Sequence, residues 1–343
     1  MAENMTKIRP FLLLLAGIII VIILVFTVGF KDVLDVLTQA NPFILAAAVV
    51  CEAGAVFLGS LKWKTLLSAF SPVSMKNAIK GILIGIFFNN VTPVARTGGE
   101  PFRAYFMEKK DGISFGDSFA AVALDRIIDS VPFMTIISIS IVYFVLLLNL
   151  STQVLIIIIL ALTLNVGALL LVLYFSLNLE AAKKLAFSFM MFVARFSNRL
   201  EKYEKSINAV VEQYHKAIKT IAAGKKNLAY CVCVSFGFWF LTVLRGYLVV
   251  LALGYEVDFM VVVVIQMVGI LVGAIPLLPG GLGSTDGIMM LLYYSFQFPA
   301  ALAVTASLLD RFISFWIMTA VGGIFVFMER EFLQCTSFND QGK

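Results

Sequence analysis

Charged side chains stand inside the long apolar segments of this sequence, and their types indicate what chemistry those segments could carry. A charge inside a lipid bilayer costs about 2.5 to 3.5 kcal/mol even on a scale from insertion experiments, so it is expected to be paired or functional. Acids and arginines are nearly balanced, which predicts a buried network of ion pairs. The members are Glu52, Glu100, Asp125, Asp129, Asp286 and Asp310, with Arg96, Arg103, Arg126, Arg245 and Arg311.

The spacing of Asp125, Arg126 and Asp129 places their side chains on overlapping faces of one helix. Residues three or four positions apart are neighbours on a helix surface. Two acids beside one arginine could hold the guanidinium, or could take up a proton when the arginine binds another group. Together with Arg96 and Arg103, Arg126 favours anion binding, because a planar guanidinium fork matches a phosphate group.

Other charges have simpler interpretations. Asp310 and Arg311 are equally compatible with a structural staple between half-helices. Glu52 and Arg245 each stand alone in an apolar segment, where they could pair with one another or with the breaks described next.

Two segments rich in glycine and proline, 89–101 and 275–287, interrupt the apolar pattern. Glycine allows close approach of backbone to a ligand, and helix starts after Pro101 and Gly283 would direct positive dipole ends into one region. An anionic headgroup is therefore the ligand that fits this region best. The predicted substrate-binding residues are Arg96, Gly98, Gly99, Glu100, Arg103, Asp125, Arg126, Asp129, Pro279, Gly280, Gly281, Gly283, Asp286, Asp310 and Arg311.

The elements that position these residues must be membrane helices. Hydrophobic residues make up 61% of the 343 residues and charged ones 14%, against about a quarter charged in soluble domains. Apolar runs of about 18 or more residues cross a bilayer as helices. Helical segments are predicted at 11–28, 42–58, 79–88 (too short to cross), 116–150 with a kink or break at Pro132, 155–177, 228–253, 260–273 and 300–327. Lys62, Lys64, Lys76 and Lys80 are assigned to one cytoplasmic connection.

The chain shows two similar halves. Glu100 precedes Asp125 by 25 residues, and Asp286 precedes Asp310 by 24, each pair joining a break to an Asp-Arg helix. If basic stretches face the cytoplasm, one broken hairpin is entered from inside and the other from outside, the arrangement of inverted-repeat transporters. We therefore predict an all-α polytopic membrane helical bundle, 1–343, with two re-entrant, broken-helix hairpins in an inverted-topology repeat. Its parts are a first core 76–177 with hairpin 79–110, a cytoplasmic amphipathic and basic loop 178–227, and a second core 228–328 with hairpin 260–298.

Several chemistries lack their residues. Four cysteines without a CxxC spacing and a single histidine cannot form a usual zinc set, and no phosphate loop or nucleophile elbow occurs. We expect no metal, no cofactor and no enzyme activity. The net charge of +5 is attributed to membrane orientation, so no nucleic-acid partner is expected.

Three motifs are typical of one protein family when they occur together: Gly98-Gly99-Glu100-Pro101-Phe102-Arg103, Asp125-Arg126-Ile127-Ile128-Asp129, and Pro279-Gly280-Gly281-Leu282-Gly283 followed by an acid. Together they resemble the transmembrane region of lysylphosphatidylglycerol synthase/flippases and of stand-alone membrane proteins similar to it. The resemblance implies a flippase-like bundle that moves a lipid between leaflets. Asp125 and Asp286 depart from it, since glutamate is expected there. The aminoacyl-transferase domain of the synthases is not found, so synthesis of a lysyl lipid is not expected.

The function predicted is movement of an anionic lipid, a phospholipid or a polyprenyl phosphate, through a charged cavity at the membrane midplane. Two alternatives stay open: a scaffold for a glycosyltransferase partner, docking through 180–227, and a membrane enzyme of lipid headgroup transfer. We expect the cell membrane as location, with both termini cytoplasmic, and homo-oligomers are possible.

Overall fold

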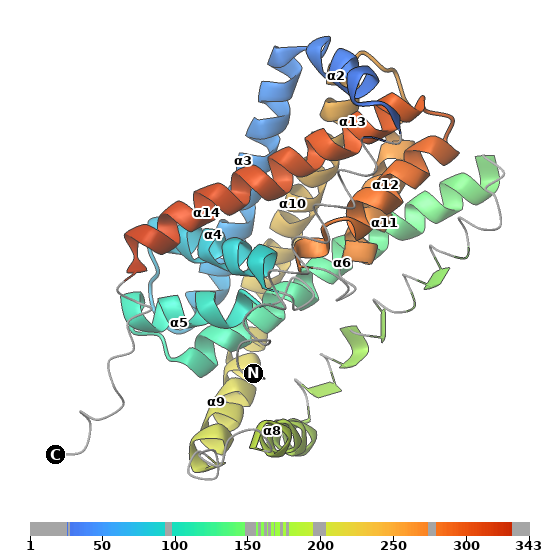
Figure 1. Ribbon diagram of the computed structural model, residues 1–343. Helices are drawn as coiled ribbons and strands as arrows, with labels where there is room; N and C mark the ends of the chain where they lie inside the picture. The colour runs from blue at the N-terminus through green and yellow to red at the C-terminus, as the bar shows by residue number, and fades with distance from the viewer. Residues whose placement is uncertain are drawn as a thin grey trace.

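The computed structural model describes residues 26, 28–92, 98–147, 178–194, 204–273 and 279–330, with scattered positions in 156–175. The described residues form helices, and no strand occurs among them (Figure 1). The predicted segments 11–28 and 155–177 lie largely outside the described residues. The helices are α2 (Phe30–Thr38), α3 (Pro42–Leu67), α4 (Met75–Val91), α5 (Glu100–Asp111), α6 (Phe115–Leu147), α8 (Leu179–Ala194), α9 (Glu204–Ala223), α10 (Lys225–Ala252), α11 (Phe259–Gly273), the short η2 (Pro279–Gly281), α12 (Ser284–Ser295), α13 (Ala300–Arg311), the π-helical η3 (Phe312–Ile317) and α14 (Met318–Met328).

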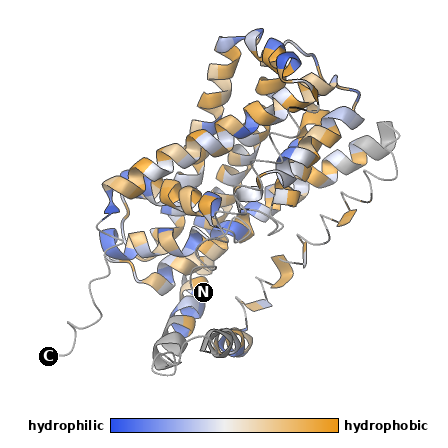
Figure 2. Ribbon diagram, in the orientation of Figure 1, coloured by the Kyte–Doolittle hydropathy of each residue, from blue (hydrophilic) through white to orange (hydrophobic). Residues whose placement is uncertain are grey.

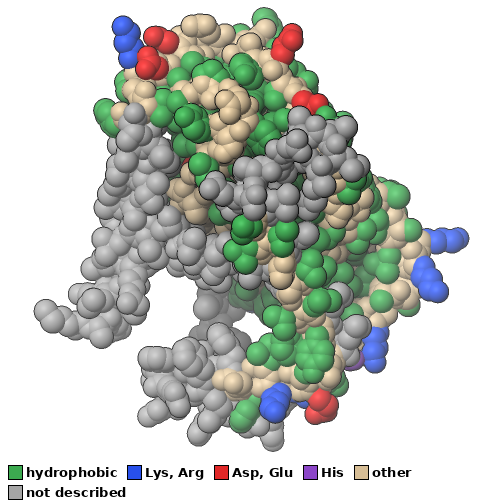
Figure 3. Space-filling view, turned by 90° about the vertical axis from the view of Figure 1, so that its right-hand side faces the viewer, with side chains coloured by type: hydrophobic (Ala, Val, Ile, Leu, Met, Phe, Trp, Pro, Cys, Tyr) green, Lys and Arg blue, Asp and Glu red, His purple; other side chains and the backbone are tan. Residues whose placement is uncertain are grey.

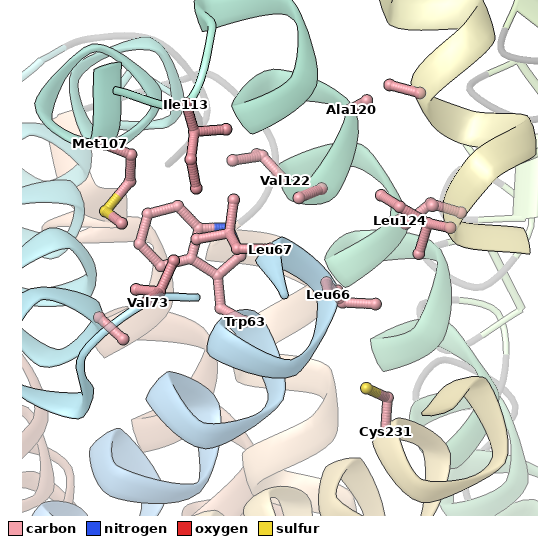
Figure 4. Packing of buried hydrophobic residues seen from close by; sticks show 14 of the residues in the cluster. Trp63, Leu66, Leu67, Val73, Met107, Ile113, Ala120, Val122, Leu124 and Cys231 are labelled. Atoms are coloured by element: carbon pink, nitrogen blue, oxygen red, sulfur yellow. The ribbon is translucent and has the colours of Figure 1, made fainter. Parts of the chain in front are cut away.

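Helix α3 begins where the sequence predicts and ends nine residues later than predicted. The Asn41 side chain accepts hydrogen bonds from the first backbone amides, and Pro42 occupies the first turn, which is a favourable helix start. The predicted end at Leu58 is wrong, because an apolar face continues through Trp63, Leu66 and Leu67. These side chains belong to a buried cluster with residues of α4, α5 and α6 (Figure 4). The assignment of Lys62 to a cytoplasmic connection is therefore wrong as well.

Helices α3 and α10 share the most extensive contact between any two described helices. Glycines permit it: a Cβ built on Gly54 would lie 3.0 Å from Leu241, and one on Gly237 would lie 3.0 Å from Leu58. Small residues at helix interfaces are typical of membrane bundles, because they let backbones approach. The pair forms the centre around which the other helices pack.

Two helix pairs, α4 with α5 and α11 with α12, lie on opposite sides of the molecule (Figure 1). In the first pair, a Cβ on Gly99 would lie 1.9 Å from the backbone oxygen of Gly85. In the second, a Cβ on Gly269 would meet Met289 at 2.8 Å. The two breaks meet between the pairs, where the Cβ position of Gly280 is 3.1 Å from a backbone oxygen of α4. Whether each pair enters and leaves on one membrane side stays a prediction.

Each half also has one long helix. Helix α6 has 33 residues and continues through Pro132; of the predicted kink or break, the break is therefore wrong, and the kink stays a prediction. The second long helix runs through α13, η3 and α14, and its regular geometry changes at η3. Pro132 lies seven residues after Asp125, and Ile317 of η3 lies seven residues after Asp310. Helix α4 packs on α14, and α11 packs on α6, so the first helix of each pair contacts the far part of the other half's long helix.

The outer surface is apolar. Three helices, Pro42–Leu67, Lys225–Ala252 and Ala300–Met328, are long and apolar enough to cross a membrane, and large side chains such as Phe43 and Phe327 are mostly exposed. Figure 2 shows apolar residues along most helices, and Figure 3 shows hydrophobic side chains over much of one face, with many charges near its ends. The chain is an all-α membrane bundle.

Helix α9 lies within 178–227, the loop predicted to be amphipathic and basic. Its apolar residues Ala217, Ile218 and Ile221 are buried in the same cluster as the start of α6. The apolar face of this helix therefore packs on protein. The cytoplasmic location of 178–227 stays a prediction.

Candidate functional site

A cavity of about 570 Å³ lies at the centre of the bundle. Among the described elements, its walls are formed by α3, α4, α5, α6, α10, α11, α12, α13 and η3. Most of the lining is apolar, from side chains such as Ile86, Phe133 and Phe238, and two networks of charged residues interrupt it. A mostly apolar cavity with a few convergent polar groups is the usual form of a ligand site.

The first network joins α3, α5 and α6. The Lys62 ammonium lies 3.0 Å from Asp125 and also contacts Asp129. Arg103 pairs with Glu100 at 2.6 Å and with Asp125 at 3.1 Å, and it lies over the ring of Trp63. Lys62 and Arg103 are therefore fully engaged: 2% and 3% of their side chains are exposed.

Arg126 completes this network in a different environment. Its Nε donates to Glu100 at 3.0 Å, and its Nη2 contacts the same carboxylate oxygen. Half of the Arg126 side chain is exposed, and it lines the cavity. Because Glu100 holds only one edge of the guanidinium, the remaining donors are available to a ligand in the cavity.

The second network joins α3, α10, α12 and α13. Arg245 donates from Nε and Nη2 to Asp310, at 2.9 and 3.2 Å, and from Nη1 to Glu52. Arg311 pairs with Asp286 at 3.2 Å and donates to the backbone oxygen of Gly280 at 3.0 Å. Of the two alternatives open for Glu52 and Arg245, pairing with one another is the one that the structure shows. The contacts of Arg311 are those of a staple that holds the second break on α13.

The two networks correspond position by position. Glu100 and Asp286 each stand in the first turn of the second helix of a pair and bind the arginine of Asp-Arg on the next long helix. The aspartates of these Asp-Arg pairs, Asp125 and Asp310, bind a base on the central pair, Lys62 of α3 and Arg245 of α10. The acids of the breaks, Glu100 and Asp286, are 186 positions apart in the sequence. The two aspartates are 185 positions apart, and the two bases are 183 positions apart. This geometry supports the two similar halves predicted from the sequence.

The glycines predicted to contact substrate have structural roles in the two breaks, and their contact with substrate stays a prediction. Gly280, Gly281 and Gly283 adopt positive φ of 58°, 69° and 78°, which favours glycine. Gly283 donates its N–H to Asp286 at 2.8 Å, and the Gly99 N–H donates to Asn89 at 2.6 Å. Among the described residues, the cavity lining does not include Gly98, Gly99, Gly280, Gly281, Gly283 or Asp286, and the side chain of Pro279 lies outside the described ones. It does include Glu100, Arg103, Asp125, Arg126, Asp129, Asp310 and Arg311, and Arg96 lies outside the described residues.

Several polar residues in or beside the cavity are not among the predicted site residues, and Lys62, Ser235 and Gln266 are the most informative of them. Lys62 was placed in a connection, and Ser235, which donates to Asp129 at 2.5 Å, looked like an ordinary residue of an apolar helix. The Nε2 of Gln266 is buried in the cavity wall without a hydrogen-bond partner. Only Gln266 carried a signal, since it is the one polar side chain in the run Phe259–Gly273. In the described part of the chain, no cluster of three His, Cys, Asp or Glu side chains is arranged to hold a metal ion.

Several known proteins are similar in sequence to this chain over most of its length. A UPF0104 membrane protein of Methanothermobacter thermautotrophicus is 31% identical, over 91% of this chain and 93% of its own length. One from Pyrococcus horikoshii is 30% identical, over 96% of this chain and 100% of its own. The Haloferax volcanii protein named glycosyltransferase AglD is 24% identical over 86% of this chain, and the match covers 50% of its length.

A family description matches as well. Residues 13–322 match the family described as the lysylphosphatidylglycerol synthase TM region. This range contains both helix pairs, the long helix α6, most of the second long helix and every charged residue of the two networks. The chain therefore belongs to the family of the lysylphosphatidylglycerol synthase transmembrane region.

Proposed function

We propose that this protein moves an anionic lipid, a phospholipid or a polyprenyl phosphate, between the leaflets of the cell membrane, with both termini in the cytoplasm. The observation that carries the proposal is the half-exposed side chain of Arg126 in a central, mostly apolar cavity, with Glu100 on only one edge of its guanidinium. A guanidinium with free donors binds a phosphate group by two parallel hydrogen bonds. The apolar walls suit the acyl or prenyl chain of the same molecule.

The other cations of the first network support this role without contacting the lipid. Lys62 and Arg103 are held by Asp125, Asp129 and Glu100. They keep the acids around Arg126 compensated, so the acids do not repel an incoming phosphate. Arg126 is then the single anchor in the described part of the site.

The test is lipid movement in liposomes by wild type, Arg126→Ala and a matched control, Arg330→Ala. Arg126→Ala should fold, because Glu100 keeps Arg103 as a partner at 2.6 Å, and Arg330 is exposed at the end of α14. Fluorescent phosphatidylglycerol and a polyprenyl phosphate serve as probes, with phosphatidylcholine for comparison. We expect Arg126→Ala to lose movement of the anionic probes and Arg330→Ala to keep it. If folded Arg126→Ala protein moves the anionic probes at the wild-type rate, Arg126 does not bind the lipid phosphate as proposed.

A second candidate function is that of a membrane subunit for a glycosyltransferase. It is favoured by the match to about half the length of a protein named glycosyltransferase. The exposed lysines Lys216 and Lys219 of α9 offer a basic docking surface. Reversing both charges should abolish co-purification of such a partner and leave lipid movement unchanged. A loss of lipid movement with an intact complex would argue against this assignment.

A further inference from the structure

One pair of matching positions in the two networks differs in charge. Arg103 and Met289 are separated by 186 residues, as are Glu100 and Asp286. Their packing also matches: a Cβ on Gly85 would meet Arg103 at 3.3 Å, and a Cβ on Gly269 would meet Met289 at 2.8 Å. The position that holds a guanidinium in the first half therefore holds a thioether in the second.

This exchange leaves the second network one positive charge short. The described part of the first network has three acids and three bases, Glu100, Asp125 and Asp129 with Lys62, Arg103 and Arg126. The described part of the second has three acids and two bases, Glu52, Asp286 and Asp310 with Arg245 and Arg311. A buried charge without compensation is very costly, and such a group neutralises by changing its protonation.

Glu52 is the acid of this network with the fewest contacts. Both oxygens of Asp310 accept from Arg245, and Asp286 accepts from Arg311 and from the backbone of Gly283. Glu52 accepts through one oxygen from Arg245, which already binds Asp310. Glu52 also lines the cavity, whereas Asp286 is 1% exposed and lies behind the wall.

The surroundings of Glu52 favour a proton over a metal cation. Arg245 from α10 faces it directly, with Asp310 of α13 and the hydroxyl of Tyr293 on α12 beyond. On α3 itself, the titratable group next to Glu52 is Cys51, and Lys62 is already held by the acids of α6. The segment η3, which also borders the cavity, contains no titratable residue. A guanidinium in contact with the carboxylate repels a metal ion, but it tolerates a neutral carboxylic acid.

The same part of the cavity offers a second polar group. The Nε2 of Gln266 is buried, has no hydrogen-bond partner, and lines the cavity beside α10, where it lies 2.1 Å from the Cβ position of Gly246. Buried polar groups of this kind are expected to bind water or a ligand. A water molecule bound at Gln266 would lie in the cavity wall beside Gly246, the residue next to Arg245 of the second network.

We infer that Glu52 is a proton-binding site, and that the proton it exchanges with cavity water is the coupling ion of the lipid movement. The second clause rests on the function proposed above. In the proton-loaded state the second network is neutral, with Asp286 and Asp310 matched by Arg311 and Arg245. Release of the proton leaves one excess negative charge in the wall of the cavity, which disfavours an anionic lipid there. Proton and lipid phosphate therefore bind together.

The protonated carboxyl group can be observed directly by infrared spectroscopy of the full chain in liposomes. Wild type at neutral pH should show the C=O stretch of a protonated carboxylic acid, and Glu52→Gln should lose it. Asp129→Asn, a matched change in the charge-balanced network, should keep it. Met289→Lys restores the missing base and should also remove the band; if it fails to fold, Glu52→Gln decides. A band that persists in Glu52→Gln, or no band in wild type, would overturn the proton site.

Lipid movement separates this inference from the proposed function. In wild type a pH gradient should drive movement of phosphatidylglycerol, and Glu52→Gln should abolish that dependence. If the infrared band behaves as expected but no lipid moves, the proton site stands and the transport proposal fails. If movement depends on Arg126 but neither on the gradient nor on Glu52, transport stands and the coupling is wrong.

Discussion

The Lys62 ammonium lies 3.0 Å from a carboxylate oxygen of Asp125, and only 2% and 6% of the two side chains are exposed. This lysine also contacts Asp129, so one base from α3 holds two acids that are one turn apart on α6. It is the counterpart of Arg245 in the second half. The contact ties the central helix pair to the helix that carries Arg126.

Replacing Lys62 should destabilise the protein strongly. Lys62→Met leaves two buried carboxylates with one base fewer, and removal of one partner from a buried ion pair costs about 3 to 5 kcal/mol. Unfolding in mixed detergent micelles measures the change. Lys64→Met, in the same helix at a partly exposed position, should change stability by about 0.5 kcal/mol or less. Equal losses in the two variants would contradict the ion-pair assignment.

Substituting Arg126 by lysine should show whether lipid binding needs only the positive charge of this side chain or also its planar guanidinium. Arg126→Lys keeps a positive charge near Glu100 but loses the planar fork, so it should fold normally. One charged hydrogen bond contributes about 1.5 to 3 kcal/mol, so affinity for phosphatidylglycerol should fall by about 10- to 100-fold. Tryptophan fluorescence can follow the titration, since Trp239 lines the same cavity. Unchanged affinity in Arg126→Lys would show that charge alone is sufficient.

The close contact between α4 and α5 should not tolerate a methyl group. Gly99→Ala places a Cβ 1.9 Å from the backbone oxygen of Gly85, and overpacking costs about 1 to 3 kcal/mol. Gly287→Ala is the matched control, because its Cβ would meet no atom within 4 Å inside α12. It should stabilise the helix by about 0.5 to 1 kcal/mol. Thermal unfolding of both variants is the measurement, and a neutral Gly99→Ala would argue against the contact.

The end of α14 should respond to acid. Hydrogen bonds from Lys110 and Lys80 lower the pKa of the Glu329 carboxyl below its usual value of 4.5. A carboxyl whose pKa is lower in the folded state stabilises the fold above its unfolded pKa, and this contribution is lost as the pH falls through the folded pKa.

The measurement is the melting temperature of wild type and Glu329→Gln between about pH 7 and pH 3. Wild type should be more stable than Glu329→Gln at pH 7, and the difference should close below pH 4.5. A difference that stays constant over this range would show that the ionised carboxyl does not contribute. Lys184→Gln, at an exposed position of α8, controls for a change of surface charge.

The sequence predicts much of this fold because its signals are local. Apolar length gives the membrane helices, and Asn41-Pro42 gives the start of α3. The two breaks follow from glycine and proline. It predicts Asp125 and Arg126, which line the cavity, because charge in an apolar run is costly wherever it pairs.

The remainder depends on contacts that no local pattern encodes. Four lysines follow the apolar run that ends near Leu58, so the sequence pattern assigns Lys62 to a connection and not to the bundle. Its partner Asp129 is 67 residues away, and Glu52 and Arg245 are 193 residues apart. The number of acids around an arginine decides whether its donors are all used or remain open to the cavity. Helix packing sets that number, so the sequence alone does not distinguish Arg103 from Arg126.

The irregular turns of the two long helices have a mechanical consequence. Proline removes a backbone hydrogen bond from α6 at Pro132, and the π-helical turn Phe312–Ile317 changes the hydrogen-bond ladder at the matching place. Each long helix thus has an irregular backbone ladder at one place, and the aspartate of its Asp-Arg lies before that place. The part after it packs against α4 or α11 of the opposite half. If the long helices bend at these turns, the separation of the halves changes while the ion pairs within each half stay intact.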